Sequence, residues 1–297
     1  MSLQELATVR EMLKGLASEE ERSLEDFRTN YDQAGEAFGI PEGVTVEKTQ
    51  MAGVPGEWLT PDGVGGKGAL LYLHGGGYAL GSTRSHRHMC AAIALALGSP
   101  VLLIDYRLAP EHPFPAAVED AVAVYRALLD SGYDASGLAI AGDSAGGGLT
   151  IATLVAARDA GLAMPAAAVC ISPWANLENV GSSYSEKADI DPMVNHDDLE
   201  RWTGAYLGGM DRKAPLASPV HADLKGLPPV LVQVGEAEVL LSDSELLTQR
   251  LKAVGVPATL KVWSDMIHVW HWFGPILSEG REATREMADF VSKRFCR

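Results

Sequence analysis

The sequence predicts an α/β fold, in which a mostly parallel sheet carries helices on both faces and a helical cap. From residue 69 onward, short apolar runs of strand length alternate with longer segments of helical pattern. One of these strands runs into a Gly-x-Ser-x-Gly turn at residues 142–146. The alternation stops between residues 173 and 226, which indicates an insertion above the carboxyl edge of the sheet.

The first part of the chain predicts two helices. Apolar residues recur at helical spacing over residues 2–17, and Ser23 is a suitable N-cap for a helix that runs to about Phe38. Glu25 and Asp26 stand in the first turn of that helix, where the helix dipole favours them.

Two antiparallel strands are expected next, over residues 44–51 and 57–60, followed by a turn over residues 63–68. The parallel part of the sheet then needs strands that are apolar on both faces. These strands are Ala69–Leu73, Val101–Asp105, Leu138–Ala141, Ala166–Ile171, Pro229–Val234 and Thr259–Trp263. The helices between them are His86–Leu97, Pro115–Asp130, Ala145–Ala160, Ser242–Val254 and Pro275–Arg294.

The insertion contains no strong strand pattern, but it carries an expected helix over Asp197–Leu207. Because the strand Thr259–Trp263 would form a sheet edge, and edges invite pairing, we expect a homodimer through it.

Composition and charge bound the function. The chain has 297 residues, and 24 Lys and Arg against 39 Asp and Glu give a net charge of −15. Phosphate binding needs clustered cations, so nucleic acid and anionic membrane surfaces are not expected partners. We find no signal-peptide pattern and no apolar run long enough to cross a bilayer, and we expect a cytoplasmic protein. Cys90 and Cys170 fall in apolar segments and Cys296 near the end, which predicts thiols rather than disulfides.

Ser144 is the candidate nucleophile. It stands in the tight turn between the strand 138–142 and the following helix, which is the position that exposes a reactive serine. A second motif, His74-Gly75-Gly76-Gly77, directly follows the strand 69–73. Glycines there let the backbone approach a negatively charged oxygen, so Gly75, Gly76 and Ala145 are the expected oxyanion-hole donors. Together the two motifs indicate acyl transfer.

A serine hydroxyl needs a base and an orienting acid, which follow it in the order acid then histidine in this arrangement. Three carboxylates follow the strand 229–234: Glu236, Glu238 and Asp243. We favour Glu238 and leave the other two open. After the last strand, His268 is the expected base, and His271 is interpreted as a packing residue.

A metal site is not expected. His86 with His88, and His268 with His271, are the only close histidine pairs that suggest one, and neither has a third ligand at a suitable spacing. No cofactor is expected either.

These residues resemble the hormone-sensitive lipase-like family of α/β-hydrolases, the bacterial family IV esterases, over about Ala69 to His268. Besides the two motifs, the run from Asp105 to Ala117 and the segment Leu227–Val230 are similar to family segments. The resemblance implies an α/β-hydrolase fold and a cofactor-free hydrolase of small carboxylic esters with short acyl chains. The family acid is more often Asp, whereas Glu238 occupies that place here. The family also has a cap built from N-terminal helices and an insertion, so the resemblance implies cap helices over 1–43, a core over 44–179, a cap insertion over 180–218 and the rest of the core over 219–297.

Two other functions stay open at this point. A lactone or amide hydrolase would use the same triad, and a non-catalytic receptor for a small ligand would use the same fold. The acyl pocket is expected to be lined by apolar residues of the cap and rim. The candidates are Tyr78, Trp174, Tyr184, Trp202, Tyr206, Val269 and Trp270. An aromatic residue on an amphipathic helix can equally pack in the core, so both interpretations stand for Trp202 and Tyr206.

Overall fold

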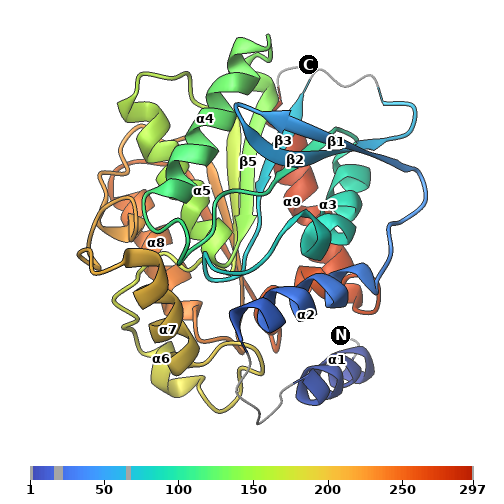
Figure 1. Ribbon diagram of the computed structural model, residues 1–297, viewed down its shortest axis with the longest axis vertical. Helices are drawn as coiled ribbons and strands as arrows, with labels where there is room; N and C mark the ends of the chain where they lie inside the picture. Colours follow the sequence, from blue (N-terminus) through green and yellow to red (C-terminus); the bar gives the residue numbers. More distant parts are fainter. Residues whose placement is uncertain (1–2, 17–22, 65–67, 296–297) are drawn as a thin grey trace.

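A computed structural model describes residues 3–16, 23–64 and 68–295. The ends of the helix expected over 2–17, the middle of the turn expected over 63–68, and Cys296 lie outside the described residues. The sheet in the described residues has the strand order β1-β2-β4-β3-β5-β6-β7-β8 (Figure 1). The β1–β2 and β2–β4 pairs are antiparallel, and all pairs from β4–β3 to β7–β8 are parallel. The fold class predicted from the sequence is confirmed.

The elements have the following bounds. The strands are β1 (Val44–Met51), β2 (Val54–Pro61), β3 (Ala69–Leu73), β4 (Val101–Ile104), β5 (Leu138–Asp143), β6 (Ala167–Ile171), β7 (Val230–Gly235) and β8 (Ala258–Trp263). The α-helices are α1 (Leu3–Leu16), α2 (Leu24–Glu36), α3 (Thr83–Leu97), α4 (Ala116–Asp130), α5 (Ala145–Asp159), α6 (Ser183–Glu186), α7 (His196–Leu207), α8 (Leu241–Ala253) and α9 (Ser278–Ser292). A 3₁₀ turn, η3, covers Trp270–Phe273.

The capping residues explain where the helices begin. Ser23 caps α2 through a capping box with Asp26, as the sequence predicted for this N-cap. Helix α3 begins three residues before its predicted start, because Ser82 forms a capping box with Ser85. Helix α9 begins three residues after its predicted start, because the chain first forms η3 and a turn. The short helix α6 was not predicted, since four residues carry too little periodicity.

The core consists of two layers, one on each face of the sheet. In β3, Leu71 and Leu73 join the layer under α4, α5 and α8, whereas Leu70 and Tyr72 join the layer under α3 and α9. This alternation follows from the two-residue period of a strand. Cys90 and Cys170 are free buried thiols, as the sequence predicted.

The N-terminal helices and the insertion meet at one end of the molecule. Figure 1 shows α1, α2, α6 and α7 at the same end of the sheet, although α2 and α6 are far apart in sequence. Among the described residues, strand β8 pairs only with β7 and is an edge of the sheet. The dimer expected through β8 stays a prediction that sedimentation would check. None of the helices in the described ranges combines the length and hydropathy that a membrane span requires.

Candidate active site

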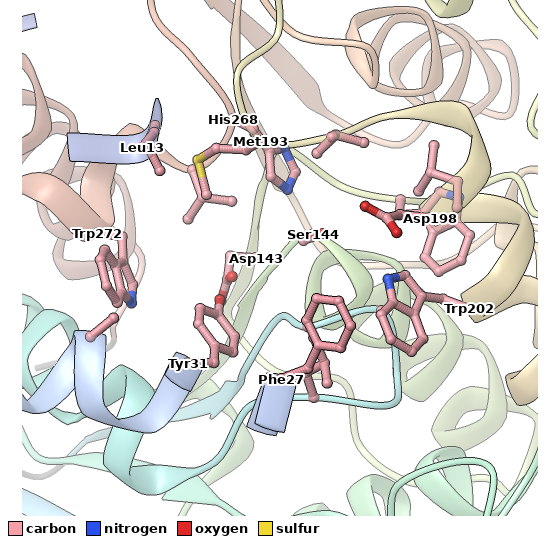
Figure 2. Close-up of a pocket in the computed structure, with 18 of the residues that line it drawn as sticks. Leu13, Phe27, Tyr31, Asp143, Ser144, Met193, Asp198, Trp202, His268 and Trp272 are labelled. Atoms are coloured by element: carbon pink, nitrogen blue, oxygen red, sulfur yellow. The ribbon is translucent and has the colours of Figure 1, made fainter. Parts of the chain in front are cut away.

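Ser144 stands on a strained turn between β5 and α5 (Figure 2). Its backbone has φ 52° and ψ −121°, a conformation that non-glycine residues rarely adopt and that persists only where the surroundings enforce it. The neighbouring glycines allow the turn to be this tight. A Cβ atom on Gly146 would lie 1.9 Å from the carbonyl oxygen of Leu73, and one on Gly142 would lie 2.3 Å from that of Gly146.

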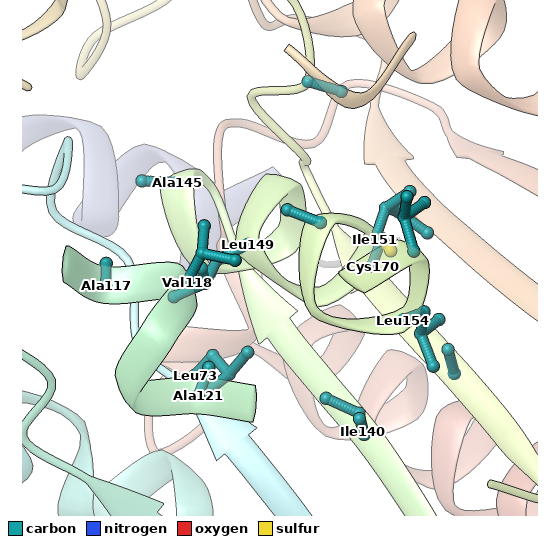
Figure 3. Packing of buried hydrophobic residues seen from close by; sticks show 14 of the residues in the cluster. Leu73, Ala117, Val118, Ala121, Ile140, Ala145, Leu149, Ile151, Leu154 and Cys170 are labelled. Atoms are coloured by element: carbon teal, nitrogen blue, oxygen red, sulfur yellow. The ribbon is translucent and has the colours of Figure 1, made fainter. Parts of the chain in front are cut away.

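Hydrogen bonds and packing hold the turn in place. The Ser144 N–H donates to the carbonyl of Ile171 at 2.8 Å, and the Ser144 carbonyl accepts from the Trp174 N–H at 2.9 Å. Figure 3 shows Ala145 and Leu149 at the start of α5 in the buried cluster that also contains side chains of α4 and β5. The serine is therefore fixed by β6 on one side and by the core on the other.

His268 is held by Glu238. The Nδ1 atom of His268 lies 2.7 Å from Oε2 of Glu238, whose side chain is completely buried. The other carboxylate oxygen of Glu238 accepts from the Ser172 hydroxyl at 2.8 Å and from the Gly235 N–H at 2.5 Å. The Ser172 oxygen in turn accepts from the Val269 N–H at 3.1 Å, which ties the loop after β8 to the end of β6.

These contacts determine the charge preference of the imidazole. Burial alone lowers the pKa of His268, but the hydrogen bond and charge of Glu238 outweigh it, with help from Asp191 and Asp143. The pKa of His268 is therefore raised above its usual 6.5. A group in this position is suited to accept a proton and to be stabilised in its charged form.

Ser144 and His268 line the same cavity, of about 290 Å³. Figure 2 shows Ser144 in the middle of this cavity, with the His268 ring near it. Within the described part of the chain, neither the Ser144 hydroxyl nor Nε2 of His268 forms a hydrogen bond with another protein group. Both are thus available for chemistry, and such contacts commonly tighten only when substrate binds.

The two other candidate carboxylates lie elsewhere. Glu236 is exposed and accepts from the Asp265 N–H at 3.3 Å. Asp243, in the first turn of α8, accepts from the N–H groups of Ala175 and Asn176 at 3.1 and 3.0 Å and from the Tyr184 hydroxyl at 3.0 Å. Burial raises the pKa of Asp243 to about 7. Of the three carboxylates, only Glu238 contacts His268.

We expect Asp243→Ala to destabilise the protein by about 2–4 kcal/mol, because it leaves two buried N–H groups and a hydroxyl without partners. Urea unfolding would measure this difference in the free energy of unfolding. The matched control is Asp130→Ala, an exposed carboxylate at the end of α4, which should change stability by less than about 0.5 kcal/mol. Equal stability of the two variants would contradict a structural role for Asp243.

The glycine loop departs from the expectation at one position. The Gly75 N–H donates to Oδ1 of Asp143 at 3.1 Å, and Gly75 does not line the cavity. Gly75 is therefore not placed to donate to an oxyanion, because its amide already holds the residue before Ser144. Gly76 and Gly77 do line the cavity, and Ala145 begins α5, where the first N–H groups of a helix have no intrahelical acceptor.

A buried network supports this loop. Asp143 accepts from the Tyr72 hydroxyl at 2.9 Å and lies 3.3 Å from Nε2 of His86. Burial alone would raise the pKa of Asp143, but His86 and Tyr72 lower it below its usual value. The His74 ring stacks on Tyr106, whose hydroxyl donates to the His74 carbonyl at 2.7 Å. Tyr106, in the run that starts at Asp105, thus holds the start of the glycine loop in place.

Two other histidines, His88 and His271, are buried and hydrogen-bonded away from Ser144. Nε2 of His271 lies 3.0 Å from the Gln233 side-chain oxygen, and Nε2 of His88 lies 2.8 Å from the Trp272 carbonyl. His271 is therefore a packing residue, as its position in the sequence indicated. No group of three or more His, Cys, Asp or Glu side chains in the described residues is arranged to hold a metal ion.

Some of the predicted pocket residues line the cavity and others do not. Trp202, Val269 and Trp174 line it. Tyr78, Tyr184, Tyr206 and Trp270 do not. Tyr78 and Tyr206 stack on each other with ring centroids 3.7 Å apart, Tyr184 bonds to Asp243, and the Trp270 indole donates to the carbonyl of Glu279. These four side chains pack in the core, which is the other interpretation that the sequence allowed.

Several wall residues were missed by the sequence analysis. The N-terminal helices contribute Leu13, Phe27 and Tyr31, and the insertion contributes Met193 and Asp198, among others. Figure 2 shows Asp198 and Trp202 of α7 together on one side of the cavity, opposite Trp272. The amphipathic pattern of the N-terminal helices signals that one face is buried, but it does not say against what.

Comparison with known proteins identifies the family of the chain. Residues 70–272 match the model of a family described by its α/β-hydrolase fold. An acetyl-hydrolase of Streptomyces hygroscopicus is 47% identical over 294 residues, covering 98% of this chain and 97% of that protein. A putative acetyl-hydrolase of Mycobacterium tuberculosis is 37% identical, covering 83% of this chain and 80% of that protein.

Solved structures are similar over the whole chain. The crystal structure of an esterase from the bacterial hormone-sensitive lipase family has a TM-score of 0.97 at 48% identity, with both chains completely covered. An esterase/lipase from an uncultured bacterium has a TM-score of 0.94 at 46% identity over 98% of each chain. With the family match and these identities, the chain belongs to the α/β-hydrolase superfamily and, within it, to the hormone-sensitive lipase-like family of bacterial esterases.

Proposed function

We propose that this protein hydrolyses short-chain carboxylic esters through a Ser144–His268–Glu238 triad and a covalent acyl-enzyme. The observation that carries the proposal is the 2.7 Å hydrogen bond that Nδ1–H of His268 donates to Glu238, with Ser144 on the same cavity. The protein is a carboxylic ester hydrolase, which excludes the alternative of a non-catalytic receptor.

The first half of the reaction forms the acyl-enzyme. Nε2 of His268 takes the proton of the Ser144 hydroxyl as Oγ attacks the ester carbonyl carbon. The carbonyl oxygen becomes negative in the tetrahedral intermediate. Glu238 holds the imidazole in the required tautomer and stabilises its positive charge. His268 then gives the proton to the leaving alcohol oxygen as the C–O bond breaks.

The amides of Gly76, Gly77 and Ala145 are the donors that we assign to the negative oxygen. Gly77 takes the place first expected for Gly75, whose amide is bonded to Asp143. Each such donor typically contributes about 2.7–4 kcal/mol to the stability of the transition state. In the second half, His268 deprotonates a water molecule that attacks the acyl carbon, and Ser144 is released as the alcohol.

The cavity suits small neutral esters. Its volume of about 290 Å³ is at the lower end of the range of roughly 300–1,000 Å³ that is common for ligand sites. Its walls are mostly apolar, and Asp198 places a carboxylate on one side. An anionic substrate would be repelled by that charge and by the net charge of −15. Two relatives are named acetyl-hydrolases, and an acetyl group is the smallest common acyl group that this cavity would hold.

Turnover of p-nitrophenyl esters from acetyl to palmitoyl tests this proposal. We expect kcat/KM to be highest for acetyl to butyryl esters and to fall for longer chains, because the apolar walls enclose limited space. Higher kcat/KM for long chains than for the butyryl ester would contradict the substrate class. Turnover of lactones or amides together with failure on every ester would replace it with the alternative hydrolase.

Trp202→Ala is expected to relax the chain-length limit. The Trp202 ring lines the cavity beside Gly77 and packs edge-on against Phe27 at 5.9 Å, so its removal opens space next to the reacting carbonyl. The ratio of kcat/KM for octanoyl over acetyl esters should rise about tenfold. Met210→Ala is the matched control, because Met210 follows α7, is 55% exposed and does not line the cavity. An unchanged ratio in Trp202→Ala would show that Trp202 does not limit chain length.

A further inference from the structure

A second cavity, of about 570 Å³, is lined in part by His271, Gly274 and Pro275, which follow His268 in the chain. It is enclosed by residues 38–41 after α2, by one side of α3, and by the start of α9. Its volume falls within the range of roughly 300–1,000 Å³ that is typical of small-molecule sites. It shares none of its lining residues with the cavity around Ser144.

The walls of the second cavity are apolar and partly open. Phe38, Ile40, Met89 and Leu95 are among the side chains that form them. Ile40 and Leu95 are 45% and 40% exposed, which is unusual for large aliphatic side chains that border one hollow. An apolar molecule in the cavity would remove this surface from water, and that burial would favour binding.

Two arginine side chains lie at the rim of the second cavity. Arg281 and Arg285 are one helical turn apart on α9, and both are exposed. Arg281 donates to the Gly274 carbonyl at 2.7 Å, and neither arginine forms an ion pair within the described residues. By contrast, Arg28, Arg84 and Arg87 each hold a carboxylate. Two unpaired guanidinium groups beside an apolar hollow, on a chain of net charge −15, favour a ligand with an anionic end.

The inner wall carries two polar atoms that lack partners. His88 and His271 line the cavity, are 4% and 2% exposed, and each has a buried Nδ1 without a hydrogen bond. Burial lowers the pKa of His88 to about 4 and that of His271 to about 3, so both rings are neutral at pH 7. Since Nε2 of His88 donates to a carbonyl, its Nδ1 is an acceptor. Unsatisfied buried acceptors are uncommon, and because both Nδ1 atoms are themselves buried, the two rings form part of the wall without offering a polar contact to a ligand.

The second cavity is connected to the first by one short segment. His271 and Gly274 face the second cavity, whereas His268 and Trp272 line the first. Phe38, on the wall of the second cavity, packs edge-on against Trp272 with ring centroids 5.0 Å apart. A molecule in the second cavity would therefore contact His271 and Gly274, which lie in the segment that follows His268.

We propose that the second cavity binds a monocarboxylate with an apolar chain, its carboxylate on Arg281 and Arg285 and its chain along Met89 and Leu95. Occupancy changes turnover at Ser144 through residues 268–274. The binding site is independent of the proposed reaction, while its effect on turnover rests on the proposed function.

Calorimetric titration with sodium octanoate, carried out on Ser144→Ala protein so that chemistry does not interfere, tests the binding. We expect octanoate to bind to this protein. Adding both Arg281→Gln and Arg285→Gln to it should weaken the affinity for octanoate about tenfold or more. Ala92→Phe, which fills the cavity from α3, should weaken it as well. Arg250→Gln, an exposed unpaired arginine on α8, is the charge-matched control and should change the affinity by less than about twofold.

Octanoate affinity that is the same in the double arginine variant and in Ala92→Phe would overturn the site, since the fatty acid would then be bound elsewhere. Octanol that binds as tightly as octanoate would overturn the role of the arginines. For the coupling, octanoate should change kcat for p-nitrophenyl acetate in the wild type and not in the double variant. An equal change in both would place the effect in the first cavity. A failure of ester turnover would leave the titration result standing, so the two proposals fail separately.

Discussion

Replacing Ser144 with alanine is expected to lower kcat for p-nitrophenyl acetate by at least about 10⁴-fold. The reason is that Oγ of Ser144 is the atom that forms the acyl-enzyme, and among the described residues no other serine, and no threonine, cysteine or lysine, lines the cavity with His268. Steady-state turnover with a titrated amount of folded enzyme would measure the loss. Thermal unfolding should be nearly unchanged, because the Ser144 side chain makes no hydrogen bond within the described residues.

Ser131→Ala is the matched control for this experiment. Ser131 is exposed at the end of α4, and its hydroxyl bonds only to the Ala127 carbonyl at 2.7 Å. Wild-type turnover in Ser131→Ala beside a lost activity in Ser144→Ala supports the assignment. If Ser144→Ala kept more than about 1% of wild-type kcat, another group would have to be the nucleophile.

Glu238→Gln is expected to lower kcat by about 10³- to 10⁴-fold with little change in KM. A glutamine can donate its amide N–H to Nδ1 of His268, which moves the imidazole proton to Nε2, the atom that must accept the proton of Ser144. It also cannot stabilise the imidazolium. The glutamine oxygen can still accept from Ser172 and Gly235, so the fold should be kept.

Asp243→Asn is the matched control for Glu238→Gln. It tests whether the loss of any buried carboxylate near the site lowers kcat, or only the loss of the one that contacts His268. Asn keeps an oxygen for the N–H groups of Ala175 and Asn176, and Asp243 does not contact His268. We therefore expect its kcat to stay within about threefold of wild type, close to the effect of a structural change away from the chemistry. A loss in Asp243→Asn as large as that in Glu238→Gln would contradict Glu238 as the orienting acid.

The pH profile gives a second measure of the same contact. His268 must be neutral to act as base, so kcat/KM should rise with pH as the imidazolium loses its proton. Because Glu238 raises the pKa of His268 above 6.5, the midpoint of that rise should lie above 6.5 in the wild type. Without the negative charge of Glu238, burial dominates and the midpoint should move to lower pH in Glu238→Gln. A midpoint that stays in place would mean that Glu238 does not act on the titrating group.

The sequence predicted the sheet and the turn that holds Ser144 because these depend on local patterns. Short apolar runs and the small residues around Ser144 are legible without tertiary information. The sequence alone could not decide among Glu236, Glu238 and Asp243, because all three lie between the end of β7 and the first turn of α8. Only the path of the loop after β8 decides which of them reaches His268.

The wrong predictions at the site share one physical cause. Contacts with residues far away in the sequence decide which way an amide or a side chain points. All glycines of the loop are equally free to turn, but the Gly75 amide is taken by Asp143, 68 residues later. Trp202 and Tyr206 are one turn apart on α7, yet Tyr206 stacks on Tyr78 while Trp202 lines the cavity. Phe27 and Tyr31 could not be assigned to the cavity, because helical periodicity does not name the partner surface.

The most direct test of the central claim is to trap the acyl-enzyme. Wild-type protein would be mixed with p-nitrophenyl acetate, quenched in acid within the first turnover, digested and analysed by peptide mass spectrometry. The account predicts a burst of p-nitrophenol and an acetyl group on Ser144, with neither in Ser144→Ala. An acetyl group on another residue, or rapid turnover with no acylated peptide, would contradict a mechanism through Ser144.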